Sequence, residues 1–163
     1  MTGVQTCALP IDILDMFEII QEQVKRNQLA IVPELEDFKW MLKNPNVNCV
    51  VHENSDGLVD GYIVAWKFKF AGYGNIIPFG WLDLVHTYRL SVKDATDLCK
   101  FLAFTSHQLG WNGLQMPYIP YFDPKPFTKS KFIFFPKMLT VDVFRRSDIP
   151  FPEKIDSFYF DWR

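Results

Sequence analysis

Residues 76–110, IIPFGWLDLVHTYRLSVKDATDLCKFLAFTSHQLG, hold the pattern on which the fold depends. The apolar content of 76–86 is typical of a strand, in which Pro78 and Gly80 indicate an edge or a bulge. The following residues repeat apolar side chains at helical spacing. We therefore predict a strand over 76–86 and a long helix over 91–109.

The ends of that helix carry recognisable signals. Ser91 and Asp94, three residues apart, are similar to a capping box, and Gly110 is suited to a helix end. The apolar positions between them are Ala95, Leu98, Cys99, Leu102 and Leu109. We expect Leu98 and Leu102 to face a sheet.

The preceding chain predicts two helices and a hairpin. Apolar spacing indicates helices over 13–28 and 33–44. Strands over 48–53 and 58–70 flank a turn at Gly57, and the second strand alternates apolar and polar residues.

The chain after the long helix predicts further strands. Residues 112–122, 132–146 and 157–163 have strand composition, and 123–132 reads as a loop with at most a short helix. A strand, a helix and a strand in succession usually form a parallel pair. We predict an α/β (α+β) fold with a mixed, mostly antiparallel sheet, one parallel strand pair and flanking helices.

The composition restricts the class of protein. The chain has 163 residues, 48% hydrophobic and 22% charged, with a net charge of −2. No apolar run approaches the roughly 18 residues of a membrane span, and no basic field attracts nucleic acid. Aromatic residues make up 17%, which implies a thick core or an apolar groove. We expect one cytoplasmic domain without nucleic-acid partners.

The first residues, MTGVQTCALPI, are unlike a secretory signal because no Lys or Arg precedes Lys25. Residues 2–11 resemble a translated sequencing adapter, as found in genes assembled from metagenomic reads. We expect residues 1–11 to be an artefact without a structural role and 12–163 to form one domain that lacks its natural N-terminus.

The cysteine and histidine spacings match no metal site. Cys49 and Cys99 lie in apolar stretches, which favours reduced core thiols, and His52 and His107 have no ligand-spaced partner. We expect no metal.

Candidate chemistry lies where strand 76–86 meets the long helix. Two roles are open for Asp83: a base that deprotonates an amine, or a carboxylate that is hydrogen-bonded to a neighbouring strand or loop. His86 is a catalytic group or a polar strand end, and it faces away from Asp83 unless the strand is bulged. Arg89 pairs with a phosphate or is simply solvated.

A second candidate cluster is aromatic. Tyr121 is able to return a proton to a leaving thiolate, although it and Tyr118 also suit a core rim. Trp66, Tyr73 and Trp81 are candidates for lining an aromatic groove.

The order of elements, from DMFEIIQEQ (15–23) through FGWLDLVH (79–86) to KFIFFPKM (131–138), resembles the GNAT acyltransferase fold. The paired helices and the hairpin VVHENSDGLVDGYI (50–63) look most like the C-terminal half of N-myristoyltransferases. The resemblance covers nearly all of 12–146.

This resemblance implies acyl-CoA as co-substrate, bound at a splay between the fourth and fifth strands. It places Leu84, Val85 and Arg89 on the cofactor side. The family's pyrophosphate loop reads R/Q-x-x-G-x-G/A, whereas residues 86–95, HTYRLSVKDA, contain no glycine. That departure fits the myristoyltransferase comparison, in which an upstream half holds acyl-CoA.

The sequence therefore predicts the acceptor-binding half of an acyl-CoA-dependent N-acyltransferase, acting on an amine or peptide. Asp83 orients or deprotonates the amine, and Tyr121 protonates the thiolate. The alternatives are a non-catalytic GNAT-like module that binds a peptide or small ligand in the aromatic groove, and a protein-interaction domain. Substrate contacts are assigned to Trp66, Tyr73, Trp81 and Tyr118.

Overall fold

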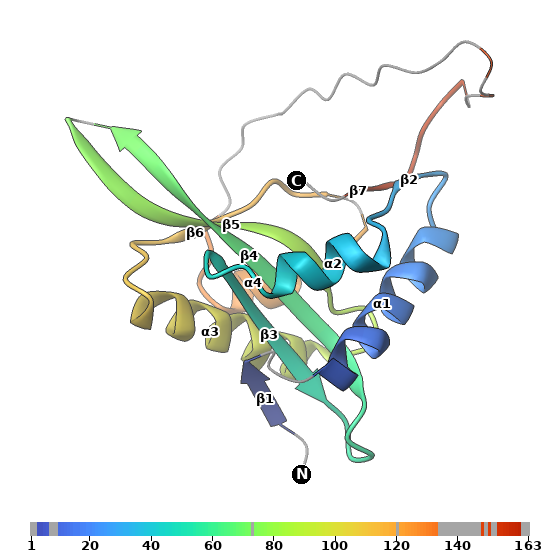
Figure 1. The fold of residues 1–163 in the computed structure, drawn as a ribbon, viewed down its shortest axis with the longest axis horizontal. Coiled ribbons are helices and arrows are strands. Elements are labelled where there is room, and N and C mark those ends of the chain that lie inside the picture. Colours follow the sequence, from blue (N-terminus) through green and yellow to red (C-terminus); the bar gives the residue numbers. More distant parts are fainter. Residues whose placement is uncertain are drawn as a thin grey trace.

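The structure is a computed structural model that describes residues 3–6, 10–72, 74–119, 121–133, 148, 150 and 153–160. The elements in chain order are β1 (Gly3–Thr6), α1 (Pro10–Lys25), β2 (Leu29–Ile31), α2 (Leu35–Leu42), β3 (Val47–Glu53), β4 (Val59–Gly72), β5 (Asn75–His86), α3 (Val92–Gln108), β6 (Leu114–Gln115), α4 (Lys125–Lys129) and β7 (Phe158–Phe160). Helices α1 and α2 pack on one face of a sheet, and α3 and α4 pack on the other (Figure 1).

The main sheet has the strand order β1-β3-β4-β5-β6. Its strand pairs are antiparallel except for β5 and β6, in which Gly80 pairs with Leu114 and Trp81 with Gln115. The predicted mixed, mostly antiparallel sheet with one parallel pair and flanking helices is confirmed. Outside this sheet, β2 and β7 form a separate two-stranded parallel sheet.

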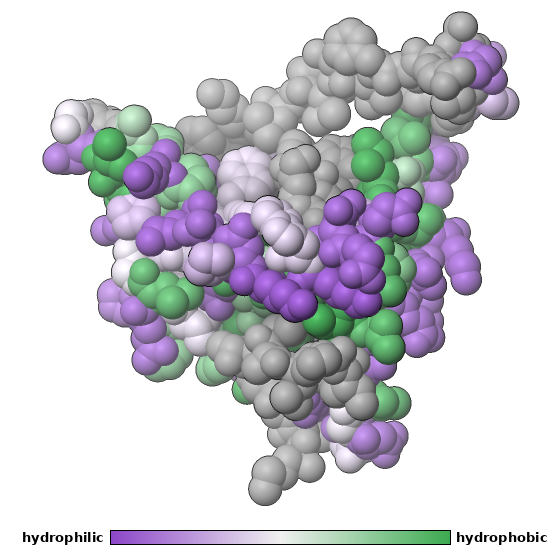
Figure 2. All heavy atoms as spheres, in the orientation of Figure 1, coloured by the Kyte–Doolittle hydropathy of each residue, from purple (hydrophilic) through white to green (hydrophobic). Residues whose placement is uncertain are grey.

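Strands β4 and β5 form a long hairpin that projects beyond the helices (Figure 1). The pairing runs from Tyr62 opposite His86 to Gly72 opposite Asn75. Near the end of the hairpin, Phe70 and Ile76 are exposed, and Figure 2 shows apolar side chains there among hydrophilic ones.

Strand β5 lies between β4 and β6, so the edge expected from Pro78 and Gly80 is wrong, and the bulge of β5 lies at Asp83 instead. Proline cannot donate a backbone hydrogen bond, so it is tolerated where its nitrogen faces away from a ladder. The Pro78 carbonyl accepts a hydrogen bond from Asn112 N–H, and Gly80 N–H donates to the Gly113 carbonyl.

The first core lies between α1, α2 and the sheet. Its fully buried side chains include Met16, Ile20, Phe38 and Met41 from the helices and Tyr62 from β4. The outer face of α2 is hydrophilic, as Figure 2 shows. The amphipathic pattern of α2 therefore buries one side of the helix and solvates the other.

The second core lies under α3. Leu98 and Leu102 are fully buried against the sheet, as predicted, and Cys99 lies beside them. Burial raises the pKa of the Cys99 thiol to about 12, so it remains protonated at neutral pH. Cys49 is buried in the first core, so both cysteines occupy core positions as predicted.

The ends of α3 also follow the prediction. Ser91 is the N-cap, and its Oγ accepts the Asp94 N–H at 3.2 Å and donates to Asp94 Oδ2 at 2.6 Å. The helix is followed by Gly110 with φ of 76°, a conformation that glycine adopts without a Cβ penalty.

The chain after α3 differs from the expected strand over 112–122, because β6 contains only Leu114–Gln115. Pro117 lacks a backbone N–H, and Ile119 and Phe122 are buried in the second core rather than continuing a ladder. The short helix α4 falls within the expected loop. The strand predicted over 132–146 lies almost entirely outside the described residues.

The N-terminal segment also differs from the expectation. Gly3–Thr6 pair antiparallel with Val50–Glu53 as β1, and α1 begins at Pro10. The expectation that residues 1–11 take no part in the fold is therefore wrong for β1 and for the first turn of α1. Among the described residues, no helix is both long and apolar enough to cross a membrane.

Candidate active site

The candidate site surrounds the C-terminal half of β5, beyond the point where its pairing with β6 stops. The parallel pairing ends at Trp81 and Gln115, and β5 continues to His86. Thr87–Leu90 then lead into α3. In open sheets, the carboxyl end of a parallel pair facing a helix N-terminus is a common position for ligands.

A bulge in β5 decides which side chains meet there. Val64 is paired with Leu84, and the next residue, Ala65, is paired with Leu82, so Asp83 is an extra residue in β5. The bulge reverses the alternation of side chains after Leu82. Leu82 belongs to the second core, on the α3 side of the sheet, whereas Leu84 belongs to the first core, on the α1/α2 side.

The bulge places Asp83 and His86 on the same side of the sheet. Asp83 bonds to Trp66, which packs against the α1/α2-side core. The His86 ring lies 4.6 Å from the ring of Tyr62 in that core. Asp83 and His86 therefore lie on the same face of the sheet, which two strand residues three positions apart do only when the strand is bulged.

Asp83 is a buried carboxylate, with 2% of its surface exposed. Its Oδ2 accepts a hydrogen bond of 3.1 Å from Trp66 Nε1. A buried charge is costly unless hydrogen bonds or an opposite charge compensate it. The indole N–H of Trp66 supplies part of that compensation.

His86 is neutral at physiological pH. Its side chain is almost fully buried, and burial lowers its pKa from 6.5 to about 3. Nε2 lies 3.2 Å from the Tyr159 hydroxyl, and Nδ1 has no hydrogen-bond partner among the described residues. These properties do not favour His86 as a proton acceptor from solvent-exposed groups.

Tyr121 lies directly against β5. Its hydroxyl accepts a hydrogen bond of 3.1 Å from Val85 N–H, and its ring forms an edge contact with Tyr159 at 5.1 Å. Gln23 of α1 donates to the Tyr121 carbonyl at 3.4 Å. The Tyr121 hydroxyl thus accepts the backbone N–H of Val85, which is then not available to a ligand.

The residues assigned to the cofactor side lie in different surroundings. The side chains of Leu84 and Val85 are buried in opposite cores, so their backbone is the part that a ligand would contact. The Val85 N–H already donates to Tyr121. At the start of α3, the Ser91 hydroxyl occupies the Asp94 N–H.

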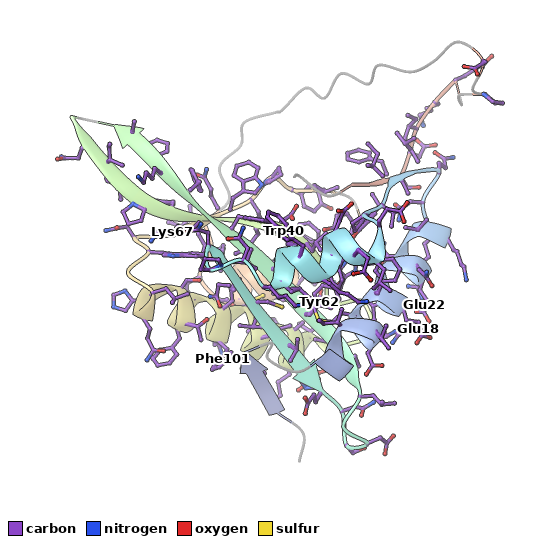
Figure 3. The ribbon with its side chains drawn as sticks, viewed as in Figure 1. Glu18, Glu22, Trp40, Tyr62, Lys67 and Phe101 are labelled. Carbon is purple, nitrogen blue, oxygen red and sulfur yellow. The ribbon has the colours of Figure 1, made fainter. Side chains whose placement is uncertain are left out.

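Arg89 forms a two-point ion pair with Glu22 of α1 rather than standing alone in solvent. Arg89 Nη2 lies 2.6 Å from Glu22 Oε1, and Arg89 Nε donates to Oε2 at 3.2 Å. The Tyr88 hydroxyl also donates to Oε2 at 2.6 Å. The hydrogen bonds from Arg89 and Tyr88 lower the pKa of Glu22 from 4.5 to about 2. Figure 3 shows Glu22 on α1.

The aromatic residues divide between the two faces of the sheet. Trp66 and Trp81 are direct cross-strand partners, so they form one surface. Tyr118 is 56% exposed and contacts Phe122 of the α3-side core. The structure therefore brings together the two tryptophans and separates Tyr118 from them. Tyr73 lies outside the described residues.

Sequence reasoning missed the residues that surround His86 and Arg89. Tyr62, Tyr159 and Glu22 come from β4, β7 and α1, far apart in the chain. Strand composition around Tyr159 predicts a strand, but it gives no indication of the strand's partner. Tyr62 lies behind α2 in Figure 3. Within the described part of the chain, no three His, Cys, Asp or Glu side chains form a metal-binding group.

Several solved structures with the same fold are acetyltransferases. An aminoglycoside acetyltransferase from an uncultured soil metagenomic sample, solved with trehalose, has a TM-score of 0.68 and 12% identity, covering 89% of this chain and 97% of that one. Glucosamine-6-phosphate N-acetyltransferase from Arabidopsis thaliana has a TM-score of 0.62 and 12% identity, covering 89% and 99%. A predicted acetyltransferase with acetyl-CoA from Clostridium acetobutylicum has a TM-score of 0.65 and 14% identity, covering 87% and 96%.

These similarities show that the chain has the GNAT acetyltransferase fold. No protein-family model and no curated protein matches the sequence.

Proposed function

We propose that this chain is an N-acyltransferase-type domain that binds an amine acceptor beside Asp83, and that this amine receives the acyl group from a CoA thioester. The observation that carries this proposal is the buried Asp83 carboxylate, displaced by the bulge at the end of the parallel pair and bonded to Trp66 Nε1. A protonated amine pairs favourably with such a carboxylate because the attraction between opposite charges is stronger in a buried site than in water.

Asp83 orients the amine and takes its proton, which leaves a neutral nitrogen lone pair. That nitrogen attacks the thioester carbonyl, so a carbon–nitrogen bond forms and the carbon–sulfur bond breaks. The thiolate then takes a proton from the Tyr121 hydroxyl, and the Tyr121 oxygen takes up the second proton, which the nitrogen loses as the amide forms. The Val85 N–H donates to this oxygen and stabilises the negative charge left after the proton departs.

Several contacts support assigning the described residues to the acceptor side. Residues 86–95 contain no glycine that would let backbone amides approach a pyrophosphate. Arg89 is paired with Glu22, Ser91 caps its own helix, and Tyr121 occupies the Val85 N–H. An acyl-CoA molecule at this position would displace existing hydrogen bonds. We propose that an upstream half of the intact protein contributes acyl-CoA contacts.

The test measures amine binding and acyl transfer separately. Sisomicin and glucosamine 6-phosphate serve as amine probes in titration calorimetry, and release of CoA thiol reports transfer from acetyl-CoA. Asp83→Asn removes the negative charge and nearly preserves shape, so we expect at least one bound amine to lose about tenfold in affinity, or about 1.4 kcal/mol.

Asp60→Asn is the matched control, because Asp60 pairs with His52 at 2.6 Å, whereas Asp83 bonds to Trp66. We expect this variant to bind the amine like the unsubstituted chain. Equal amine affinities for Asp83→Asn and Asp60→Asn would contradict the assignment of Asp83.

A non-catalytic module remains the second candidate, favoured by the Trp66–Trp81 surface together with the glycine-free residues 86–95. Such a module binds a peptide or small ligand through aromatic contacts. It would bind its ligand without any thiol release, even when an upstream half is supplied. Thiol release that depends on Asp83 would exclude it.

A further inference from the structure

We propose that Tyr159 of β7 is a positioning residue of the candidate site, whose hydroxyl fixes the His86 proton on Nδ1. The inference rests on the proposed function for the role of the site. It deepens that function by adding a residue from the C-terminal strand. The assignment comes from one hydrogen bond, the burial of both side chains and the acidity of the two groups.

Both side chains are enclosed. Tyr159 is fully buried, and its hydroxyl lies 3.2 Å from His86 Nε2. The rings of the two residues are 5.6 Å apart, and the rings of Tyr62 and Tyr121 lie 4.6 Å and 6.1 Å from the imidazole. Bulk water therefore does not compete for this hydrogen bond.

The direction of the hydrogen bond follows from acidity. A phenol is a much stronger acid than a neutral imidazole N–H, and an imidazole nitrogen is a stronger base than a phenol oxygen. The Tyr159 hydroxyl therefore donates and His86 Nε2 accepts. A neutral imidazole has one proton, so that proton lies on Nδ1.

The proton on Nδ1 gives the site a specific hydrogen-bonding character. Nδ1 has no partner among the described residues, and a buried polar atom without a partner is unusual in a folded protein. As a donor, Nδ1 suits an oxygen acceptor and not an ammonium group.

Tyr159 is held in position by contacts outside the main sheet. In the β2–β7 pair, Ala30 is opposite Tyr159. Gln28 extends this contact, because its N–H donates to the Ser157 carbonyl and its Oε1 accepts the Asp156 N–H at 2.7 Å. The pairing of β7 with the segment after α1 thus fixes the tyrosine opposite β5.

The test reads the imidazole directly by long-range proton–nitrogen NMR. In the 163-residue chain, His52→Gln and His107→Gln together leave His86 as the remaining histidine, because the sequence contains three. We expect the nitrogen shifts of a protonated Nδ1 and an unprotonated Nε2. A protonated Nε2 in this protein would overturn the proposal without any substitution at Tyr159.

Tyr159→Phe in the same background removes the donor and keeps the ring. We expect the Nδ1-protonated form to lose its dominance, with the Nε2-protonated form becoming visible. Tyr62→Phe is the control, because its hydroxyl donates to the Met16 carbonyl and not to His86.

Identical His86 spectra in the Tyr159→Phe and Tyr62→Phe variants would overturn the proposal. If Tyr159→Phe does not fold, the spectrum of the parent protein still decides the tautomer. No substrate is needed for this readout, so its failure is distinct from a failure of amine binding at Asp83.

Discussion

Trp66 Nε1 donates a hydrogen bond of 3.1 Å to Asp83 Oδ2, although the cross-strand partner of Trp66 is Trp81. Asp83 is the extra residue that the bulge inserts in β5. Its contact with Trp66 joins the aromatic surface of the β4–β5 hairpin to the buried carboxylate. A strand without the bulge would place His86 on the opposite face from Asp83.

We expect Trp66→Phe to destabilise the protein by about 1–3 kcal/mol, because it removes a hydrogen bond to a buried carboxylate while keeping an aromatic ring. The measurement is the free energy of unfolding in urea. Trp40→Phe is the control, since Trp40 is 65% exposed on α2 and a small effect is expected there. Equal losses in the two variants would contradict the importance of the Trp66–Asp83 bond.

We expect His86 to make the protein less stable as pH falls from about 6.5 to about 3. The unfolded chain protonates His86 below its ordinary pKa of 6.5, whereas the folded chain does so only near 3. Stability is therefore highest above that window, and the slope is at most about 1.4 kcal/mol per pH unit for one proton.

Urea unfolding between pH 7 and pH 3 checks this expectation. His86→Phe keeps a ring beside Tyr62 and should flatten the profile, whereas His107→Phe changes an exposed residue and should leave the slope intact. A His86→Phe profile with the original slope would show that another group causes the pH dependence.

The Glu22–Arg89 ion pair predicts a second, more acidic window. The folded-state pKa of Glu22 is about 2, below its ordinary value of 4.5, so its stabilising contribution is present above 4.5 and is lost as pH falls toward 2. Arg89→Ala should make the loss of stability across this window shallower. Thermal unfolding at pH 5 and pH 2.5 measures it, and an unchanged difference between the two would contradict the role of the pair.

We expect the chain alone to bind acetyl-CoA weakly, with a dissociation constant no tighter than roughly 100 μM, or about 5.5 kcal/mol. Residues 86–95 contain no glycine, and Arg89 is already paired with Glu22. Titration calorimetry measures the affinity, and Arg89→Ala should change it little. Low-micromolar binding that Arg89→Ala abolishes would contradict the acceptor-side assignment and indicate a self-sufficient acetyltransferase.

We expect Leu98→Ala and Leu102→Ala each to cost about 2–5 kcal/mol, because both side chains are fully buried between α3 and the sheet. Phe104→Ala is the control on the same helix, since Phe104 is 56% exposed. Urea unfolding measures all three. Losses that are no larger for the leucines than for Phe104 would contradict the packing of α3.

The sequence by itself determined the elements that local signals encode. The spacing of Leu98 and Leu102, the Ser91 cap and the glycine after α3 fixed the long helix, because these interactions act within a few residues. The strand, helix and strand order predicted the parallel pair β5–β6. Pro78 and Gly80 suggested an edge or a bulge, whereas β5 is an inner strand whose bulge lies at Asp83.

The tertiary structure alone decided the partners of the candidate site residues. Tyr159 reaches His86, and Glu22 reaches Arg89, across more than sixty positions of the chain. Periodicity reports whether a side chain faces a core, but it does not say which distant segment supplies that core. The alternation of β5 also reverses at a single inserted residue, which a pairing register reveals and a strand's composition does not. The pattern of helices and strands is therefore determined by local sequence, whereas the burial of His86 and the pairing of Arg89 arise only when α1, β5 and β7 pack together.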